Sequence, residues 1–429
     1  MTTFLSHTTA DTHVGPAYSG PPPLHAVTAF RRVLHVLPDL QIGGGQTIVL
    51  NHLLHADPVT NRITVAVLRG DTPGARAMTE QFEAVLDQPV IDLGHGSARG
   101  DLGVVRRLIQ LIRKGRFDLV HVHSDVDRKL GQVAALVTGT PVVGHLHAEW
   151  VHLGPMAPER PTVLRAARAR ALACLRDRIE RRTVSHYIAE SVRVRDIFRP
   201  LVRQPIDVLQ QSIPSDRFGI TSQERRLVRS ELDIAPDAPV VICVSRLVEG
   251  KGHHHLLESL AELRRSWPDL VGVLVGDGEL RTGLEAQARE LHVDHAVRFV
   301  GDRHDVPRLL GAADVFAFAS ETEGFGLCVL EAMAASLPVV AMHCPALEEF
   351  VTPGVTGDLV PQGDVEALTA ALHSILLDPC RGERYGRAGR EVVCDRFAPD
   401  AVARSFQAVY DRVAPVDASG SNRNPEERQ

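Results

Sequence analysis

The sequence predicts an α/β fold made of two parallel-sheet domains in tandem. Short runs of Val, Ile and Leu alternate with longer segments of helical periodicity through residues 31–413. Strands that are apolar along their whole length are typical of parallel sheets covered by helices on both faces. The alternation occurs once before and once after a polar, proline-containing stretch at residues 214–238, which predicts an interdomain linker. Two domains of ~150 to 200 residues each also suit the length of the chain.

Seven segments in residues 30–213 and five in residues 239–397 have the composition of buried strands. Those of the first domain are "RVLHVL", "ITVAVL", "VIDLG", "DLVHVH", "PVVGHLH", "HYIAES" and "IDVLQQS". Those of the second are "PVVICVSRL", "LVGVLVGDG", "VRFVG", "DVFAFAS" and "PVVAM". The stretch "APDAVARSFQAVYDRV", near the end of the chain, is helical in pattern. Residues 1–29 and 415–429 are rich in small and polar residues, and we expect them to be disordered tails.

Composition excludes several classes of function. The net charge of -6 argues against a globally basic surface for nucleic acid. No apolar stretch reaches the length of a membrane-spanning helix, and the N-terminus lacks the pattern of a secretory signal. The six cysteines form no C-x-x-C pair, which favours reduced thiols and a cytoplasmic protein.

Ligands of open parallel sheets bind at the carboxyl ends of the strands, so the loops after the strands are the place to look for chemistry. Arg246 and Lys251 follow one strand, with a helix start close behind them. Two cations beside free helix N–H groups suit a diphosphate, although a solvated loop would have the same composition. Gly276 and Gly278 follow the next strand and allow a close approach of the backbone to a ring or a phosphate; a tight turn without a ligand is the alternative.

The stretch "SETEGFGLCVLEA", residues 320–332, places two carboxylates around the start of a helix. Glu323 lies in the loop after a strand, and the helix is expected to begin near Gly326 or Leu327. Its N–H groups and positive dipole end would face an anion. Glu331 then lies one to two turns into the helix, where a carboxylate can accept hydrogen bonds from two vicinal hydroxyls. A helix cap and a solvent-facing residue are the alternatives for the two glutamates.

These stretches together resemble the retaining GT-B glycosyltransferases of family 4. The likeness is dense in "GKGHHHLL", "LVGDGELR" and "VRFVGDRHDVPRLLGAADVFAFASETEGFGLCVLEAMAASLPVVA", and it extends to "IGGGQTIVLNHL" near the N-terminus. The spacing of seven residues between Glu323 and Glu331 is the hallmark of that family. The resemblance implies two Rossmann-like domains facing a central cleft. It also implies sugar transfer from a nucleoside diphosphate sugar, with a UDP-sugar as the first candidate, to an acceptor hydroxyl with retention of configuration.

The resemblance also assigns residues. The catalytic group would consist of His147, Arg246, Lys251 and Glu323. Further substrate contacts would come from Gly43, Gly44, His123, Gly276, Gly278, Gly324, Phe325, Gly326, Leu327 and Glu331. The first domain would bind the acceptor, and a helix at 398–414 would return to pack on it. The chain departs from the family pattern at residues 211–214, "QSIP", after the last strand of the first domain.

No metal site and no cofactor besides the sugar donor are expected. The D-x-D pattern of Asp125 and Asp127 opens a helix in the acceptor domain, away from the cations expected to hold the diphosphate. The triple histidine at 253–255 is expected to lie on a helix surface after Lys251, although such a tract can bind metal.

Two questions stay open in the sequence. A nucleotide-sugar epimerase or a non-catalytic nucleotide-sugar-binding subunit would share the fold and the donor site. The acceptor is also undetermined. The basic, amphipathic stretch 160–182 is compatible with peripheral contact at the inner membrane face and a lipid-linked sugar acceptor. Asp125, Asp127 and Glu149 would instead favour a cationic acceptor such as an amino sugar or an aminocyclitol.

Overall fold

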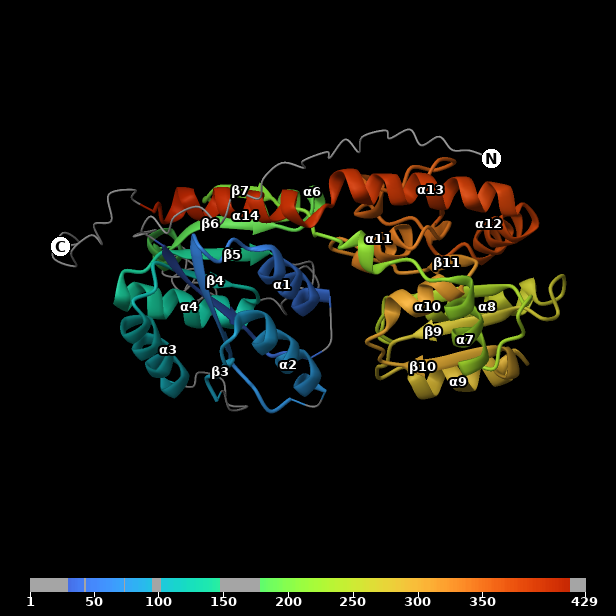
Figure 1. Ribbon diagram of the computed structural model, residues 1–429, viewed down its shortest axis with the longest axis horizontal. Helices are drawn as coiled ribbons and strands as arrows, with labels where there is room; N and C mark the ends of the chain where they lie inside the picture. The colour runs from blue at the N-terminus through green and yellow to red at the C-terminus, as the bar shows by residue number, and fades with distance from the viewer. Residues whose placement is uncertain (1–29, 42–43, 73, 95–101, 147–177, 417–429) are drawn as a thin grey trace, which may run out of the picture.

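The computed structural model describes residues 30–41, 44–72, 74–94, 102–146 and 178–416. It contains two parallel sheets, one in each domain, and the domains lie next to one another along the long axis of the molecule (Figure 1). The first sheet has seven strands in the order β3-β2-β1-β4-β5-β6-β7, and the second has six in the order β10-β9-β8-β11-β12-β13. The predicted α/β fold with two parallel-sheet domains is confirmed.

The first domain alternates strands and helices as the sequence predicts. Its strands are β1 Arg31–Leu37, β2 Asn61–Val67, β3 Ile91–Asp92, β4 Leu119–Val122, β5 Val142–Leu146, β6 Val184–Ala189 and β7 Ile206–Val208. Its helices among the described residues are α1 Gly44–His55, α2 Ala75–Leu86, α3 Leu102–Gly115, α4 Asp125–Thr138 and α6 Val192–Phe198.

The second domain repeats the scheme. Its strands are β8 Val240–Val244, β9 Val271–Val275, β10 Val297–Gly301, β11 Val315–Phe318, β12 Val339–Met342 and β13 Gly357–Val360. The helices that pack around this sheet are α7 Ser222–Glu231, α8 His253–Leu263, α9 Arg281–Glu290, α10 Val306–Ala312, α11 Leu327–Ala334, α12 Val365–Leu377 and α13 Pro379–Arg396. The last helix, α14 Pro399–Val413, crosses back to the first domain.

Each sheet has an apolar core on both of its faces. In β1, Val33 and Leu37 belong to one cluster of buried side chains, whereas Leu34 and Val36 belong to the cluster on the opposite face. Side chains of a strand point alternately to the two faces, so a sheet covered on both sides needs apolar residues at successive positions. This arrangement explains the uninterrupted apolar runs in the sequence.

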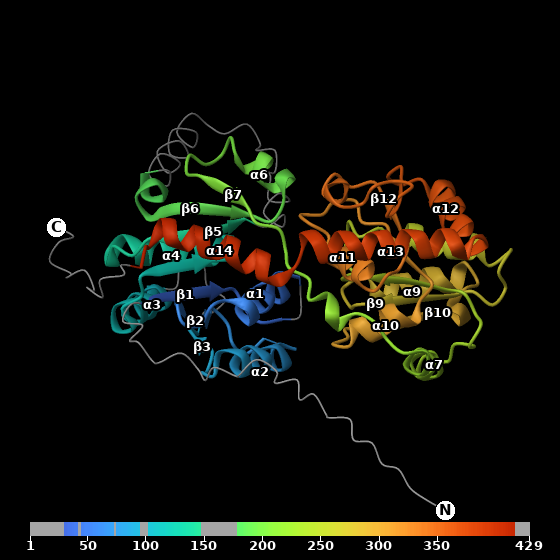
Figure 2. The ribbon, with the colours of Figure 1, turned by 45° about the horizontal axis from the view of Figure 1, so that its top comes forward.

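The chain crosses between the domains a second time near its end. Figures 1 and 2 show α13 and α14 as consecutive red helices, α13 over the second domain and α14 over the first. Phe406 and Tyr410 of α14 are buried in the core of the first domain together with Val33 of β1. α14 thus occupies the stretch in which a returning helix was expected, and it completes one face of the first sheet.

The expected linker at 214–238 contains a helix of the second domain. α7 begins with a capping box, in which the Thr221 hydroxyl accepts from Glu224 N and the Glu224 carboxylate accepts from Thr221 N. Val228 of α7 and Ile234, which follows it, belong to the buried apolar cluster of the second domain. Most of this stretch therefore packs as part of that domain.

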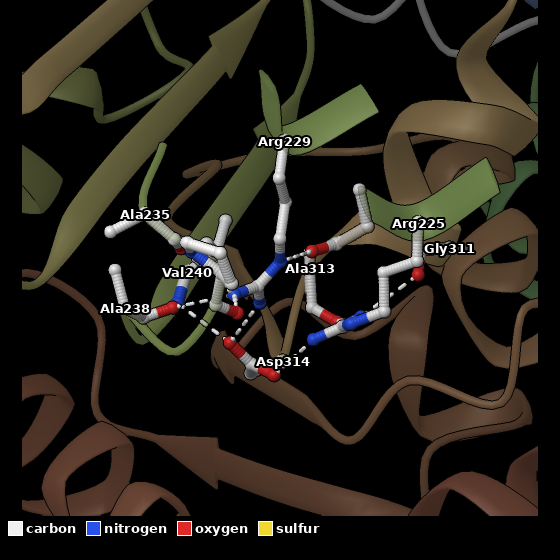
Figure 3. A network of polar contacts seen from close by, with 10 residues as sticks. Arg225, Arg229, Ala235, Ala238, Val240, Gly311, Ala313 and Asp314 are labelled. Carbon is white, nitrogen blue, oxygen red and sulfur yellow. Dashed lines mark hydrogen bonds and ion pairs between the residues drawn. The ribbon is translucent and has the colours of Figure 1, made fainter. Parts of the chain in front are cut away.

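Arg229 fastens α7 to the second domain (Figure 3). Its buried guanidinium donates hydrogen bonds to the carbonyl oxygens of Ala312, Pro236 and Ala238 over 3.0, 2.6 and 2.9 Å. It also donates to the Asp314 carboxylate over 2.9 Å. One side chain thereby joins α7, the loop that follows it and the end of α10.

Asp314 is the anion on which this network depends (Figure 3). Besides Arg229, its carboxylate accepts from the Arg225 guanidinium over 2.6 Å and from Val240 N over 2.8 Å. Val240 is the first residue of β8, so the network fixes α7 against the start of that strand.

Two further expectations concern membranes and the tails. Among the described residues, no helix combines the length and apolar character needed to cross a bilayer. Most of the basic stretch 160–182 and almost all of the two expected tails lie outside the described residues.

We predict that Asp314→Ala destabilises the second domain by about 1.5 to 3 kcal/mol, because it leaves the buried Arg229 without its anion. The Asp314 side chain is itself 35% exposed, which favours the lower part of this range. Urea unfolding followed by circular dichroism measures the loss. The control is Glu262→Ala on α8, which removes a half-exposed carboxylate 2.8 Å from Arg265 and should change stability little. Equal losses in the two variants would contradict this account.

Candidate active site

A cavity of about 760 Å³ lies between the domains, within the range of small-molecule sites in proteins. Its walls come from both domains. On the first-domain side they include Asp39, Asn51 and Glu190, and on the second-domain side they include the loops after β8 and β11. The carboxyl ends of the strands of both sheets therefore meet at one cavity, as expected for open parallel sheets.

Lys251 and Glu323 form an ion pair on the second-domain wall. The Lys251 ammonium lies 2.6 Å from the Glu323 carboxylate, and both side chains are more than four-fifths buried. Arg246 lines the same cavity at the exit of β8. The loops are also joined through their backbones, because Glu321 N donates to the Gly250 carbonyl oxygen over 2.8 Å. The cations expected at the β8 exit and the first carboxylate of the spaced pair thus lie together.

Glycines allow these loops to approach one another closely. A Cβ atom on Gly252, at the start of α8, would lie 2.1 Å from the Ala319 carbonyl oxygen. One on Gly276 would lie 2.2 Å from the Ser245 carbonyl oxygen. Contacts this short exclude any side chain without a shift of the backbone. The glycine at 276 therefore brings the β8 and β9 exits together, in addition to lining the cavity.

The first turn of α11 forms part of the cavity wall. Gly326 caps the helix with φ of 90°, a left-handed conformation that favours glycine, and Leu327 is the first helical residue as expected. The first N–H groups of a helix have no partners within it, so they are available to an anion. Phe325 anchors the turn, because its buried ring packs against Phe350 and Phe397 at centroid distances of 5.6 and 5.9 Å.

Glu331 lines the cavity from the second turn of α11. Burial disfavours its charged form and raises its pKa from 4.5 to about 7, against the opposing attraction of Arg217. A carboxyl group with a pKa near neutrality is characteristic of a functional site, because it can bind either as an acceptor or as a proton donor.

Most of the predicted site residues lie together. Those that line the cavity are His123, Arg246, Lys251, Gly276, Glu323, Gly324, Phe325, Gly326, Leu327 and Glu331. Gly278 is not among the lining residues; a Cβ atom there would lie 2.4 Å from the Leu247 carbonyl oxygen, so it serves loop packing. Gly44 begins α1, and the neighbouring Gly45 lines the cavity. Gly43 and His147 lie outside the described residues.

The expectation for the triple histidine was wrong for its first member. His253 is buried rather than on the helix surface, and its Nε2 lies 2.8 Å from the Ser245 hydroxyl. Burial lowers the pKa of His253 to about 4, so the ring is neutral. His254 is exposed, as expected. The difference arises because the start of α8 is held close to the exits of β8 and β11, where Ser245 receives the first histidine.

Three basic residues of the cavity wall were not among the predicted site residues. Arg217 follows the first crossing between the domains, and Arg303 and His304 follow β10. Arg303 forms a two-bond ion pair with Asp305, at 2.7 Å for each bond. The position of 303 and 304 after a predicted strand was an available signal. No comparable signal pointed to Arg217, because residues 214–238 were predicted to be a linker.

Two family profiles match consecutive parts of the chain. The profile described as "Glycosyltransferase Family 4" matches residues 42–217, and that described as "Glycosyl transferases group 1" matches residues 224–392. The first therefore covers most of the first domain, and the second covers most of the second domain.

The chain is also similar to individual proteins. A GDP-mannose-dependent alpha-(1-6)-phosphatidylinositol monomannoside mannosyltransferase of Mycolicibacterium smegmatis is 36% identical over 201 residues, which are 45% of this chain and 52% of that protein. The match thus spans about half the length of this relative. Glycogen synthase of Mycobacterium tuberculosis is 28% identical over 405 residues, 93% of each chain.

A solved structure, Anabaena HepE in complex with UDP and glucose, superposes with a TM-score of 0.75. The superposition covers 89% of this chain and 100% of that one, at 22% identity. At this identity the likeness establishes the fold alone.

The raised pKa of Glu331 predicts a pH dependence of stability. The unfolded chain releases this proton near pH 4.5 and the folded chain near pH 7, so between these values the unfolded state binds fewer protons and stability falls as pH rises. The loss of stability is absent below pH 4.5 and is complete above about pH 7. Glu331→Gln removes the ionisation, so its stability relative to the natural protein should increase from about pH 5 to about pH 8. Urea unfolding at both pH values measures the difference in unfolding free energy between the variant and the natural protein. A difference that does not change with pH would argue against the raised pKa.

Proposed function

The chain belongs to the group 1 glycosyltransferases of the GT-B fold, and from this premise we propose that it transfers a sugar from a nucleoside diphosphate sugar to an acceptor hydroxyl. The observation that carries the proposal is the convergence of Arg246, Lys251 and the start of α11 on one cavity wall. Two cations and a helix N-terminus on one wall form a site for a diphosphate.

The diphosphate binds between the β8 exit and the start of α11. Lys251, which bonds Glu323 over 2.6 Å, then shares its charge between that carboxylate and a phosphate oxygen. Glu323 in turn keeps the ammonium in place before the donor arrives and accepts hydrogen bonds from hydroxyls of the donor sugar. Because both groups are already largely buried, little water has to be removed from them on binding.

Glu331 binds the ribose of the donor. Its carboxylate, one turn beyond the start of α11, accepts from the two vicinal hydroxyls of the nucleoside. Ionisation of this group is costly in the empty cavity, as its pKa of about 7 indicates, and two hydroxyl donors favour the charged form. UDP-sugars are the first donors to test, with GDP-mannose as the second, since HepE was crystallised with UDP and the mycobacterial relative uses GDP-mannose.

The transfer breaks the bond between the anomeric carbon and the diphosphate and joins that carbon to the acceptor oxygen. Negative charge builds on the departing diphosphate, where Arg246, Lys251 and the α11 dipole stabilise it. The departing phosphate oxygen takes the proton of the incoming hydroxyl, because Glu323 is engaged by Lys251. The acceptor therefore enters on the face from which the diphosphate leaves, and the anomeric configuration is retained. In this scheme the protein's own cations take the place of a metal ion.

The acceptor binds against the first domain. That wall presents the side chains of Asp39, Asn51, Glu190 and Gln211, which suit a polyhydroxylated sugar. Its two carboxylates would also favour an acceptor that carries an amine, such as an aminocyclitol. A lipid-linked sugar is the other candidate, and an assay with and without anionic vesicles distinguishes it.

The assay offers each nucleotide sugar with a panel of sugar, lipid-linked and aminocyclitol acceptors, and the anomeric proton coupling of the product reports retention. An arm with donor alone separates the alternatives. Epimerisation of the donor without an acceptor would replace the transferase by an epimerase, and nucleotide binding without any turnover would indicate a binding subunit. Addition of magnesium should leave the rate unchanged.

We predict that Lys251→Ala lowers kcat by roughly a hundred- to a thousandfold and weakens nucleotide binding much less. The reason is that its phosphate partner gains charge only as the sugar leaves. Steady-state kinetics and nucleotide titration measure the two effects. Lys114→Ala, at an exposed position of α3, is the matched control and should have no effect. A loss of binding with kcat unchanged would remove Lys251 from the chemistry.

Glu331→Ala should weaken donor binding by roughly ten- to a hundredfold, as expected for the loss of charge-assisted hydrogen bonds worth ~1.5 to 3 kcal/mol. Titration with the ribonucleotide and the 2′-deoxyribonucleotide in natural and variant protein completes a double-mutant cycle. The variant should discriminate less between the two nucleotides than the natural protein does. The same discrimination in both proteins would place the ribose elsewhere.

A further inference from the structure

Five histidines are buried close together in the first domain. His35 lies on β1, His121 on β4 and His145 on β5, His123 follows β4, and His52 lies on α1. His35 and His121 are register partners on adjacent strands, with ring centroids 4.7 Å apart. Burial of a polar ring is unfavourable unless its nitrogens find partners, so such a group calls for a ligand or a complete hydrogen-bond network.

Three of these rings come within reach of a common point. One ring nitrogen from each of His35, His121 and His123 lies within 4.8 Å of the others. The closest pair is His35 Nδ1 and His123 Nε2, 3.0 Å apart. The Nε2 atom of His121 is buried and has no hydrogen-bond partner among the described residues.

The outer nitrogens of two of these rings share one anchor. The Tyr410 hydroxyl of α14 lies 2.8 Å from His121 Nδ1 and 3.1 Å from His35 Nε2. Metal-binding histidines are usually oriented in this way, by a hydrogen bond from the ring nitrogen that does not bind the metal. Tyr410 therefore holds His121 through Nδ1 and His35 through Nε2, and the other nitrogens, His121 Nε2 and His35 Nδ1, are the ones that can bind a metal.

The positions of the protons show whether the cluster can be a complete hydrogen-bond network or needs a ligand. A neutral imidazole has one N–H and one lone pair. If His121 uses its N–H toward Tyr410, its Nε2 lone pair is buried without a donor. If it uses its lone pair there, its Nε2–H is buried without an acceptor. A hydrogen-bond network of the described residues therefore leaves one group unsatisfied.

A cation resolves this conflict. His35 and His121 can then both donate their outer N–H groups to the Tyr410 oxygen, and the Tyr410 hydroxyl can donate to His52 Nε2, 3.5 Å away. The lone pairs of His35 Nδ1, His121 Nε2 and His123 Nε2 are all left for the cation. The outer N–H groups of His35 and His121 and the Tyr410 hydroxyl proton then all have acceptors.

We propose that His35, His121 and His123 form a binding site for a divalent transition-metal ion of the zinc class. Three neutral imidazoles suit zinc and its neighbours, whereas magnesium and calcium require oxygen ligands. Burial lowers the pKa of His35 and His121, which keeps these rings in the neutral, ligating form. His123 also lines the cavity between the domains, so a fourth position of the metal would face that side.

The bound ion would join three elements of the first domain. His35 ties it to β1, His121 and His123 tie it to the end of β4, and Tyr410 links both strands to α14. The site would therefore stabilise the packing of the returning helix. Its ligands belong to the first domain, whereas Arg246 and Lys251 belong to the second, and the inference does not depend on the proposed sugar transfer.

The test uses the full chain without a histidine tag, with the exposed His254 replaced by Ala in all samples to remove surface binding. After removal of metal by a chelator, zinc is titrated against a competing indicator, and cobalt is added to report the ligands by its visible absorption. We expect one zinc per chain. His121→Gln and His35→Gln should lower the affinity by on the order of a hundredfold or more, and Tyr410→Phe by about tenfold. His145→Gln, at the neighbouring buried histidine, is the matched control and should bind as the parent does.

Thermal unfolding gives a second readout. Zinc should raise the Tm of the parent and of His145→Gln, and should leave that of His121→Gln unchanged. If the glutamine variants do not fold, the weaker binding of Tyr410→Phe carries the test. A parent chain that takes up no zinc at micromolar concentration, or equal binding by the parent, His121→Gln and Tyr410→Phe, would overturn the proposal.

Discussion

The candidate site depends on a constraint of parallel sheets. Because all strands of such a sheet run in the same direction, the loops at their carboxyl ends meet along one edge, and the helices that follow begin there with unpaired N–H groups. Both sheets of this protein present that edge to the same cavity. The loop cations after β8 and the start of α11 are therefore neighbours in space, although they are some seventy residues apart in the chain.

The close approach of the loop backbones then fixes the relative positions of the site residues. Gly252 and Gly276 leave no room for a Cβ atom between the exits of β8, β9 and β11, so the loops are held at one spacing. Phe325 fixes the turn before α11 through its aromatic contacts, and the ion pair of Lys251 with Glu323 joins the two loops. Functional groups that are held by packing and by each other need little rearrangement when a ligand binds.

The two domains differ in how they hold polar groups in their interiors. In the second domain, the buried Arg229 meets a carboxylate and several carbonyl oxygens, which satisfy its donors. In the first domain, neutral imidazoles gather around one tyrosine hydroxyl and leave His121 Nε2 unsatisfied. The first arrangement explains the attachment of α7, whereas the second points to an additional ligand.

The sequence by itself determined the fold and the second-domain half of the site. The apolar runs predicted both sheets, and the position of Arg246, Lys251 and Glu323 after strands placed them at the cavity, because strand ends are fixed once the strands are known. Only the tertiary structure decided which of these groups pair, that His253 is buried and that Arg217 reaches the cavity. It alone brought Tyr410 to His35 and His121, since these contacts join residues 375 and 289 positions apart. The local sequence pattern predicts strands and helices, whereas long-range packing determines the burial, the pKa and the hydrogen-bond partners of each polar group.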